Sequence, residues 1–167
     1  GYFDTVIDRD SFILYQRKVP QRIGPHIFGD SLMLRGFTIL PAAPWQGGMT
    51  LRPMAEWQAN SPMAERYSMT LQIVDSWGHV WARASGEPQD GGMPTDQWQV
   101  GKTMGDQYTL KLPPTMPSDD YQVVLSVQSA DGRDAPVLNA QATPVGPSAV
   151  VASIRVEKNQ GSFEASQ

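Results

Sequence analysis

The chain has 167 residues, of which 40% are hydrophobic and 18% are charged. This length and composition suit one globular domain with a substantial core and argue against a disordered chain. The formal net charge of −4 offers no basic surface for nucleic acid or anionic lipid, and the lack of cysteine excludes disulfides, thiolate catalysis and cysteine–zinc sites.

The first ten residues have neither the basic start nor the apolar core of a signal peptide, and no apolar run is long enough for a membrane-spanning helix. We expect residues 1–24 to be an N-terminal extension with one strand near residues 12–15, cut from a longer parent or left after a signal is removed. Residues 25–157 form the predicted folded domain, and residues 158–167 a flexible tail.

Strands are predicted where apolar and polar residues alternate. Residues 31–40 and 49–59 give the first two, and Pro53 in the second must lie at an edge or a bulge because it has no N–H group. Residues 67–73 alternate clearly, residues 75–78 (Asp-Ser-Trp-Gly) form a tight turn, and residues 79–83 return as the partner strand of a hairpin.

Three further strands follow, at residues 108–112, 121–127 and 149–156, with a proline-rich connection at 113–117 and a turn at 130–133. Short strands separated by turns, without a convincing amphipathic helix, predict an all-β fold: an immunoglobulin-like two-sheet antiparallel β-sandwich. The predicted core consists of Tyr67, Met69, Leu71, Ile73, Tyr108, Leu110, Leu112, Tyr121, Val123 and Leu125.

An ordered set of short motifs resembles a known family. The motifs are Phe28-Gly29-Asp30, Leu34-Arg35-Gly36-Phe37, Leu51 to Ala59, Tyr67 to Asp75, Gly86-x-Pro88, Pro94-Thr95-x-x-Trp98-x-x-Gly101, Asp106-x-Tyr108-x-Leu110-x-Leu112-Pro113 and Pro117-x-x-x-Tyr121. This set resembles the extracytoplasmic C-terminal β-sandwich module of bacterial multi-spanning membrane glycosyltransferases of the protein-mannosyltransferase-like kind. The sequence departs from that pattern at Asp120, where the family often has glycine, and at Gln128-Ser129, where it has Tyr-Asp. The resemblance implies fold and an extracytoplasmic location, and it carries over no catalytic residue.

Trp98 lies in a loop rich in glycine and proline, and two interpretations fit it. In the first, the indole closes one end of the sandwich, held by the Pro94-Thr95 turn and Gly101, which would remove a large apolar area from water. In the second, the ring is a platform on which the C–H face of a sugar stacks. The first interpretation is favoured.

Trp77 and Trp81 are the other main candidates for ligand binding, and Trp45 is a further one. Trp77 stands in the hairpin turn, where no local pattern buries it. Trp81 alternates with Val80 and Ala82, so it can face outward, and an exposed aromatic pair would indicate a binding face.

The aspartates lie in or beside loops, where turn chemistry explains most of them. Calcium binding and glycoside hydrolysis remain alternatives of low weight. Asp106 is predicted to accept a hydrogen bond between a loop and a strand. His26 and His79 are far apart in sequence, and no serine elbow or phosphate loop is present. The sequence therefore predicts no catalytic residue, no metal ligand and no cofactor.

We expect a non-catalytic extracytoplasmic accessory domain that docks onto a protein partner or a membrane-bound parent chain, using sheet edges and proline-rich loops. The alternative is a carbohydrate-binding module of a cell-envelope glycosylation system, which would bind an oligosaccharide through Trp77, Trp81 or Trp98.

Overall fold

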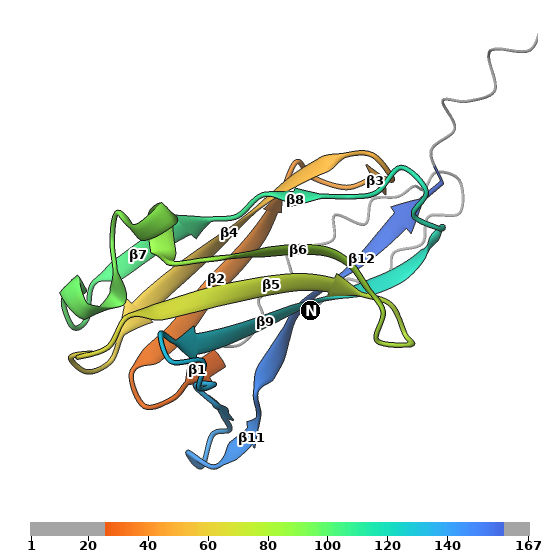
Figure 1. Cartoon of the computed structure of the whole chain (residues 1–167). Coiled ribbons are helices and arrows are strands. Elements are labelled where there is room, and N and C mark those ends of the chain that lie inside the picture. The colour runs from red at the N-terminus through yellow and green to blue at the C-terminus, as the bar shows by residue number, and fades with distance from the viewer. Residues whose placement is uncertain (1–25, 159–167) are drawn as a thin grey trace, which may run out of the picture.

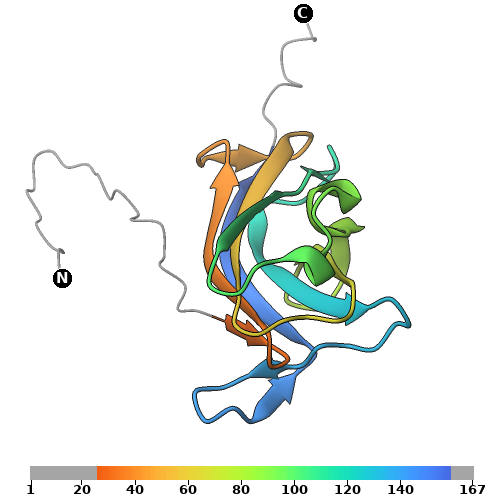
Figure 2. The same ribbon diagram turned by 90° about the vertical axis from the view of Figure 1, so that its left-hand side faces the viewer.

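A computed structural model of the chain describes residues 26–158. The predicted strand at residues 12–15 and the tail beyond Lys158 lie outside these residues. Two β-sheets pack face to face, and Figure 2 shows them as separate layers, with β2 and β4 in one and β9 and β12 in the other. Within residues 26–158, no helix has the length and apolar character needed to cross a bilayer.

One sheet has seven strands, in the order β11-β10-β1-β2-β4-β7, with β8 also paired to β4. Its strands are β1 (His26–Phe28), β2 (Leu32–Leu40), β4 (Thr50–Ala59), β7 (Thr103–Gln107), β8 (Leu110–Lys111), β10 (Val137–Leu138) and β11 (Pro144–Gly146).

The second sheet has five strands, in the order β3-β12-β9-β5-β6 (Figure 1). Its strands are β3 (Trp45–Gln46), β5 (Tyr67–Val74), β6 (Val80–Gly86), β9 (Asp119–Ser129) and β12 (Ser148–Glu157). All its pairings are antiparallel except β12 with β3. Two short 3₁₀ helices, η1 (Pro88–Gly91) and η2 (Thr95–Gln97), connect β6 to β7.

The core lies between the sheets, where inward side chains of both meet. Every predicted core residue is buried except Tyr67, which is half-buried. The predicted core lacks the inward residues of β1, β2 and β4. These include Phe28, Leu32, Leu34, Leu51 and Trp57, and the rings of Phe28 and Trp57 meet edge to face with their centroids 5.6 Å apart.

Pro53 of β4 pairs with Ile39 of β2 on one side. On the opposite side of β4, neither β7 nor β8 pairs with Pro53. On that side β7 pairs with Met54 to Gln58, and β8 pairs only with Thr50 and Leu51. The gap removes the need for an N–H donor at Pro53. The same interruption shortens the strand predicted at residues 108–112 to Leu110–Lys111.

Candidate functional site

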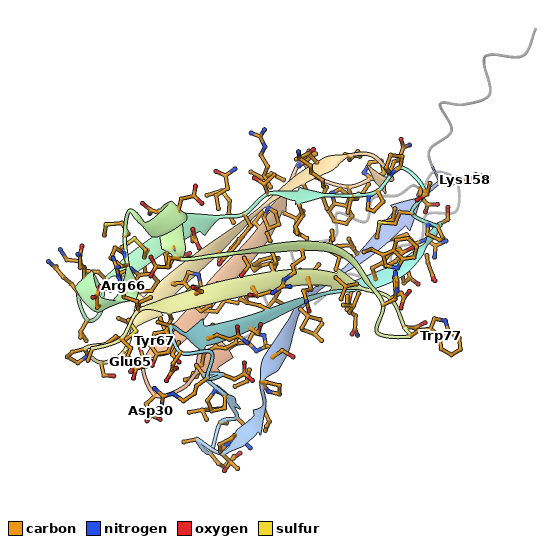
Figure 3. All side chains as sticks on the ribbon, in the orientation of Figure 1. Asp30, Glu65, Arg66, Tyr67, Trp77 and Lys158 are labelled. Carbon is orange, nitrogen blue, oxygen red and sulfur yellow. The ribbon has the colours of Figure 1, made fainter. Side chains whose placement is uncertain are left out.

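The turn between β5 and β6 presents Trp77 to solvent. The indole side chain is 92% exposed, and Figure 3 shows it pointing away from the ribbon, at the opposite end of the sandwich from Glu65 and Arg66. A tryptophan buries a large apolar area when it can, so a nearly bare indole on an ordered turn calls for a partner.

Asp75 makes this turn rigid. One of its carboxylate oxygens, Oδ1, accepts hydrogen bonds from the backbone N–H groups of Trp77 and His79, both at 2.9 Å. The backbone N–H of Gly78 donates to the carbonyl of Asp75 at 3.0 Å, and Gly78 has a φ of 83°, which a side chain would strain. The predicted turn is confirmed, and its hydrogen bonds fix the backbone from which the exposed Trp77 side chain extends.

Trp81 lies below this turn and is half-buried. Its indole Nε1 donates to the second carboxylate oxygen of Asp75, Oδ2, at 3.0 Å. This hydrogen bond is the main cause of the lowered pKa of Asp75, and the backbone hydrogen bonds of His79 and Trp77 add to it. The ring also meets the rings of His79 and Tyr121 edge to face, with centroids 4.9 Å and 6.4 Å away.

The expectation that Trp81 faces outward is therefore corrected. A bulge shifts the pairing between β5 and β6 after Ile73, so that Val74 pairs with Val80 instead of Trp81. Val80 consequently takes the outward position, and Trp81 packs toward the core. Trp81 supports the Trp77 turn instead of forming an exposed pair with it.

Trp98 is 7% exposed, and its Nε1 donates to the carbonyl oxygen of Met93 at 2.8 Å. Thr95 fixes the preceding turn because its hydroxyl accepts from the N–H of Tyr67 and donates to the carbonyl of Glu65. Gly101 adopts a φ of 85° and donates its N–H to Ala59. The first interpretation of Trp98, as a buried residue held by the Pro94-Thr95 turn and Gly101, matches this geometry, and the burial of its ring leaves no face for a sugar. Trp45 is half-buried and donates its Nε1 to the carbonyl of Pro41.

An open groove of about 580 Å³ adjoins the Trp77 turn. It is lined by Val74, Asp75, Ser76, Gly78, Asp120, Tyr121, Gln122 and Ser153. The lining combines hydroxyl, amide and carboxylate groups with the apolar side chain of Val74, and the guanidinium of Arg155 lies 3.5 Å from the carboxylate of Asp120. None of these residues was predicted as a site, and Asp75, Ser76 and Gly78 were predicted only as parts of a turn. The cross-strand register that joins β5, β9 and β12 is not visible in local sequence.

Two further aspartates, Asp106 and Asp131, have partners within the fold. Asp106 is buried and accepts the backbone N–H of Gln89 at 2.8 Å, so the predicted link between loop and strand is confirmed. Burial raises the pKa of Asp106, and this hydrogen bond opposes the shift. Asp131 pairs with Arg133 in the turn after β9. The described residues contain no group of three or more histidine, aspartate or glutamate side chains that could hold a metal ion.

Comparison with known proteins supports the fold. No protein-family model and no curated protein matches the chain. Among solved structures, the chain is similar to the C-terminal domain of Wzt, with 12% identity, a TM-score of 0.55, and coverage of 83% of this chain and 81% of that one. It also matches a Niemann-Pick type C2 protein from the Japanese carpenter ant, with 6% identity, a TM-score of 0.45, and coverage of 74% and 91%. The two-sheet topology and the similarity to the Wzt domain show that the chain is an all-β, immunoglobulin-like two-sheet sandwich, as the sequence predicts.

Proposed function

We propose that this chain is a non-catalytic accessory domain that binds a carbohydrate in the groove beside Trp77. The observation that carries the proposal is the nearly fully exposed indole on a turn fixed by Asp75, next to a groove lined by hydrogen-bonding side chains. A pyranose has an apolar C–H face and a rim of hydroxyl groups. The C–H face can stack on the indole ring of Trp77, and the hydroxyl groups can form hydrogen bonds with Ser76, Gln122 and Ser153.

The resemblance to membrane glycosyltransferase modules supports an extracytoplasmic location and attachment to a membrane-bound parent or partner. In that setting the domain would hold a glycan close to the membrane-bound enzyme, and it would contribute no reacting group itself. The carboxylates support this non-catalytic role, because Asp75 is committed to its turn and Asp106 to a loop.

The experiment is a titration with a panel of soluble oligosaccharides, followed by tryptophan fluorescence. At least one saccharide is expected to shift the emission of the wild-type chain, and Trp77→Ala is expected to abolish that response. Trp45→Phe is the matched control, because Trp45 is half-buried outside the groove lining. A response that survives in Trp77→Ala, or a panel with no binder, would overturn the proposal.

A second candidate function is protein docking by strand addition at β12. This strand pairs with β9 along most of its length, but its other side has a partner only at Val156 and Glu157, where β3 joins it, among residues 26–158. An open edge of this kind can accept a strand from another protein. If the membrane-bound parent docks here, its addition should slow amide hydrogen exchange in residues 148–155, and unchanged exchange would rule this mode out.

A further inference from the structure

Three rows of outward side chains on the five-stranded sheet run across β6, β5, β9 and β12, and the row of Asp120 and Arg155 borders them at the Trp77 end. The pairing register defines the rows. The first is Val80, Val74, Gln122 and Ser153, the second is Arg83, Gln72, Val124 and Val150, and the third is Ser85, Thr70, Ser126 and Ser148. We call this surface the three-row face.

The three-row face is nearly free of charge. Arg83 is the single charged residue in the three rows, and the exposed ion pair of Asp120 and Arg155 borders the first row. Charged residues are depleted at the centre of contact surfaces because desolvating them is costly. Because Arg83 is the one charge within the rows and Asp120 and Arg155 are paired with each other, the face gives little advantage to an ionic ligand, and the chemistry favours a neutral one.

The groups on this face suit a sugar chain. On the central strands, the first row sets Val74 beside Gln122 and the second sets Gln72 beside Val124, so each row pairs an apolar side chain with an amide. The third row is composed of hydroxyl groups. Thr70 is buried and its hydroxyl lies 2.8 Å from that of Ser85, so Ser85, Ser126 and Ser148 are the members that a ligand can reach. Alternating apolar and hydrogen-bonding groups match the C–H faces and hydroxyl groups of successive pyranoses.

The face is continuous with the Trp77 groove, because Val74, Gln122 and Ser153 of the first row line that groove. Successive rows along one strand are two residues, or about 6.7 Å, apart. This spacing is comparable to the length of one sugar ring. A chain that leaves Trp77 along β5 and β9 would therefore place about one ring over each row.

We propose that the three-row face is a series of subsites for an extended neutral oligosaccharide, whose first ring stacks on Trp77 and whose later rings pass over the second and third rows. This inference rests on the proposed function and adds to it the class and the minimum length of the ligand. The dependence of affinity on oligosaccharide length separates this inference from the proposed function. A site limited to Trp77 and its groove would bind short and long oligosaccharides equally well.

The test is isothermal titration calorimetry with linear neutral oligosaccharides of one to six hexose units, in mannan and glucan series. Affinity for the preferred series is expected to rise about tenfold or more from disaccharide to tetrasaccharide. Ser126→Arg in the third row is expected to remove this gain and to leave disaccharide binding unchanged. Ser148→Arg repeats the test at an exposed site of the same row, in case the half-buried Ser126 tolerates arginine poorly.

Thr38→Arg, on the exposed outer face of the other sheet, is the matched control and should retain the full gain. The subsite proposal is overturned, and the proposed function stands, if Trp77→Ala abolishes binding while neither oligosaccharide length nor either third-row variant changes the affinity. Loss of disaccharide binding in Ser148→Arg would also contradict the assignment of the rows. Tighter binding of uronic-acid oligosaccharides would contradict the neutral class, and a panel without any binder would overturn both proposals.

Discussion

Trp77 and Trp98 both follow turn-forming residues in the sequence, yet the structure exposes one indole and buries the other. Around Trp98, the carbonyl of Met93 accepts the indole N–H, and the ring is covered. In the Trp77 turn, the hydrogen bonds join backbone N–H groups to Asp75 and do not involve the indole ring. The difference lies in what each loop packs against, so residue type alone does not decide between a structural and a binding tryptophan.

Substituting each of these tryptophans should separate stability from binding. Trp98→Ala removes a buried ring and leaves a cavity, so it is expected to lower the free energy of unfolding by about 3–5 kcal/mol. Trp77→Ala removes an exposed ring and is expected to change it by less than about 0.5 kcal/mol. Urea denaturation followed by circular dichroism measures both. A large loss of stability in Trp77→Ala would mean that its indole packs against something in solution.

Asp75 should give the fold a characteristic loss of stability in acid. Its pKa is lowered in the folded chain, chiefly by the Trp81 hydrogen bond, relative to about 3.9 in an unfolded chain. The stabilisation is therefore fully present above about pH 4 and is lost as the pH falls through the lower folded pKa. The melting temperature of the wild-type chain should fall more steeply below about pH 4 than that of Asp75→Asn. Parallel pH profiles for the two proteins would show that the carboxylate does not stabilise the turn.

At the scale of elements, the β5–β6 hairpin is the unit that makes the candidate site. Its strands and turn were predictable, because period-two alternation ends at an Asp-Ser-Trp-Gly turn. The bulge after Ile73 was not, because it depends on how β6 meets the sheet and leaves no mark in the alternation. That bulge decides which of Val80 and Trp81 faces solvent.

Two glycines provide a matched test of the turn. Gly78 and Gly132 have φ values of 83° and 86°, and an added Cβ would meet no atom within 4 Å at either position. Replacement by alanine should therefore cost about 1–2 kcal/mol at each site from backbone strain alone. Only Gly78→Ala should also weaken saccharide binding, because it alone disturbs the turn that carries Trp77. Equal binding by the two variants would show that the turn geometry does not matter to the ligand.

At the scale of the whole molecule, the sandwich has two different ends. One end carries η2 and the loop around Trp98, and its surface bears ion pairs such as Arg66 with Asp96 and Arg133 with Glu65. The other end holds Trp77 and the groove, with the ion pairs of Arg155 with Asp120 and Glu157 beside them, and it adjoins the three-row face. The proposed ligand contacts lie at the Trp77 end and on one sheet face, and the proposed protein contact lies at the β12 edge.

The sequence predicted the sandwich, the hairpin and the alternating cores of β5 and β9, because those strands have one buried and one solvent-facing side. It did not predict β7, since Thr103–Gln107 has no apolar alternation and pairs through its backbone. Nor could it assemble the groove, since Val74, Gln122 and Ser153 meet only through the register of three strands far apart in the chain.

The most direct test of the account is the indole region of a ¹H–¹⁵N correlation spectrum, in which the five tryptophans give one side-chain N–H signal each. Signals are assigned by substitution, and a neutral oligosaccharide from the panel is then added until binding saturates. The account predicts a large shift of the Trp77 signal together with the backbone amides of Gln122 and Ser153, while the Trp57 and Trp98 signals stay in place. A bound saccharide that shifts other residues and leaves Trp77 unmoved, or the lack of any shift across the panel, would contradict it.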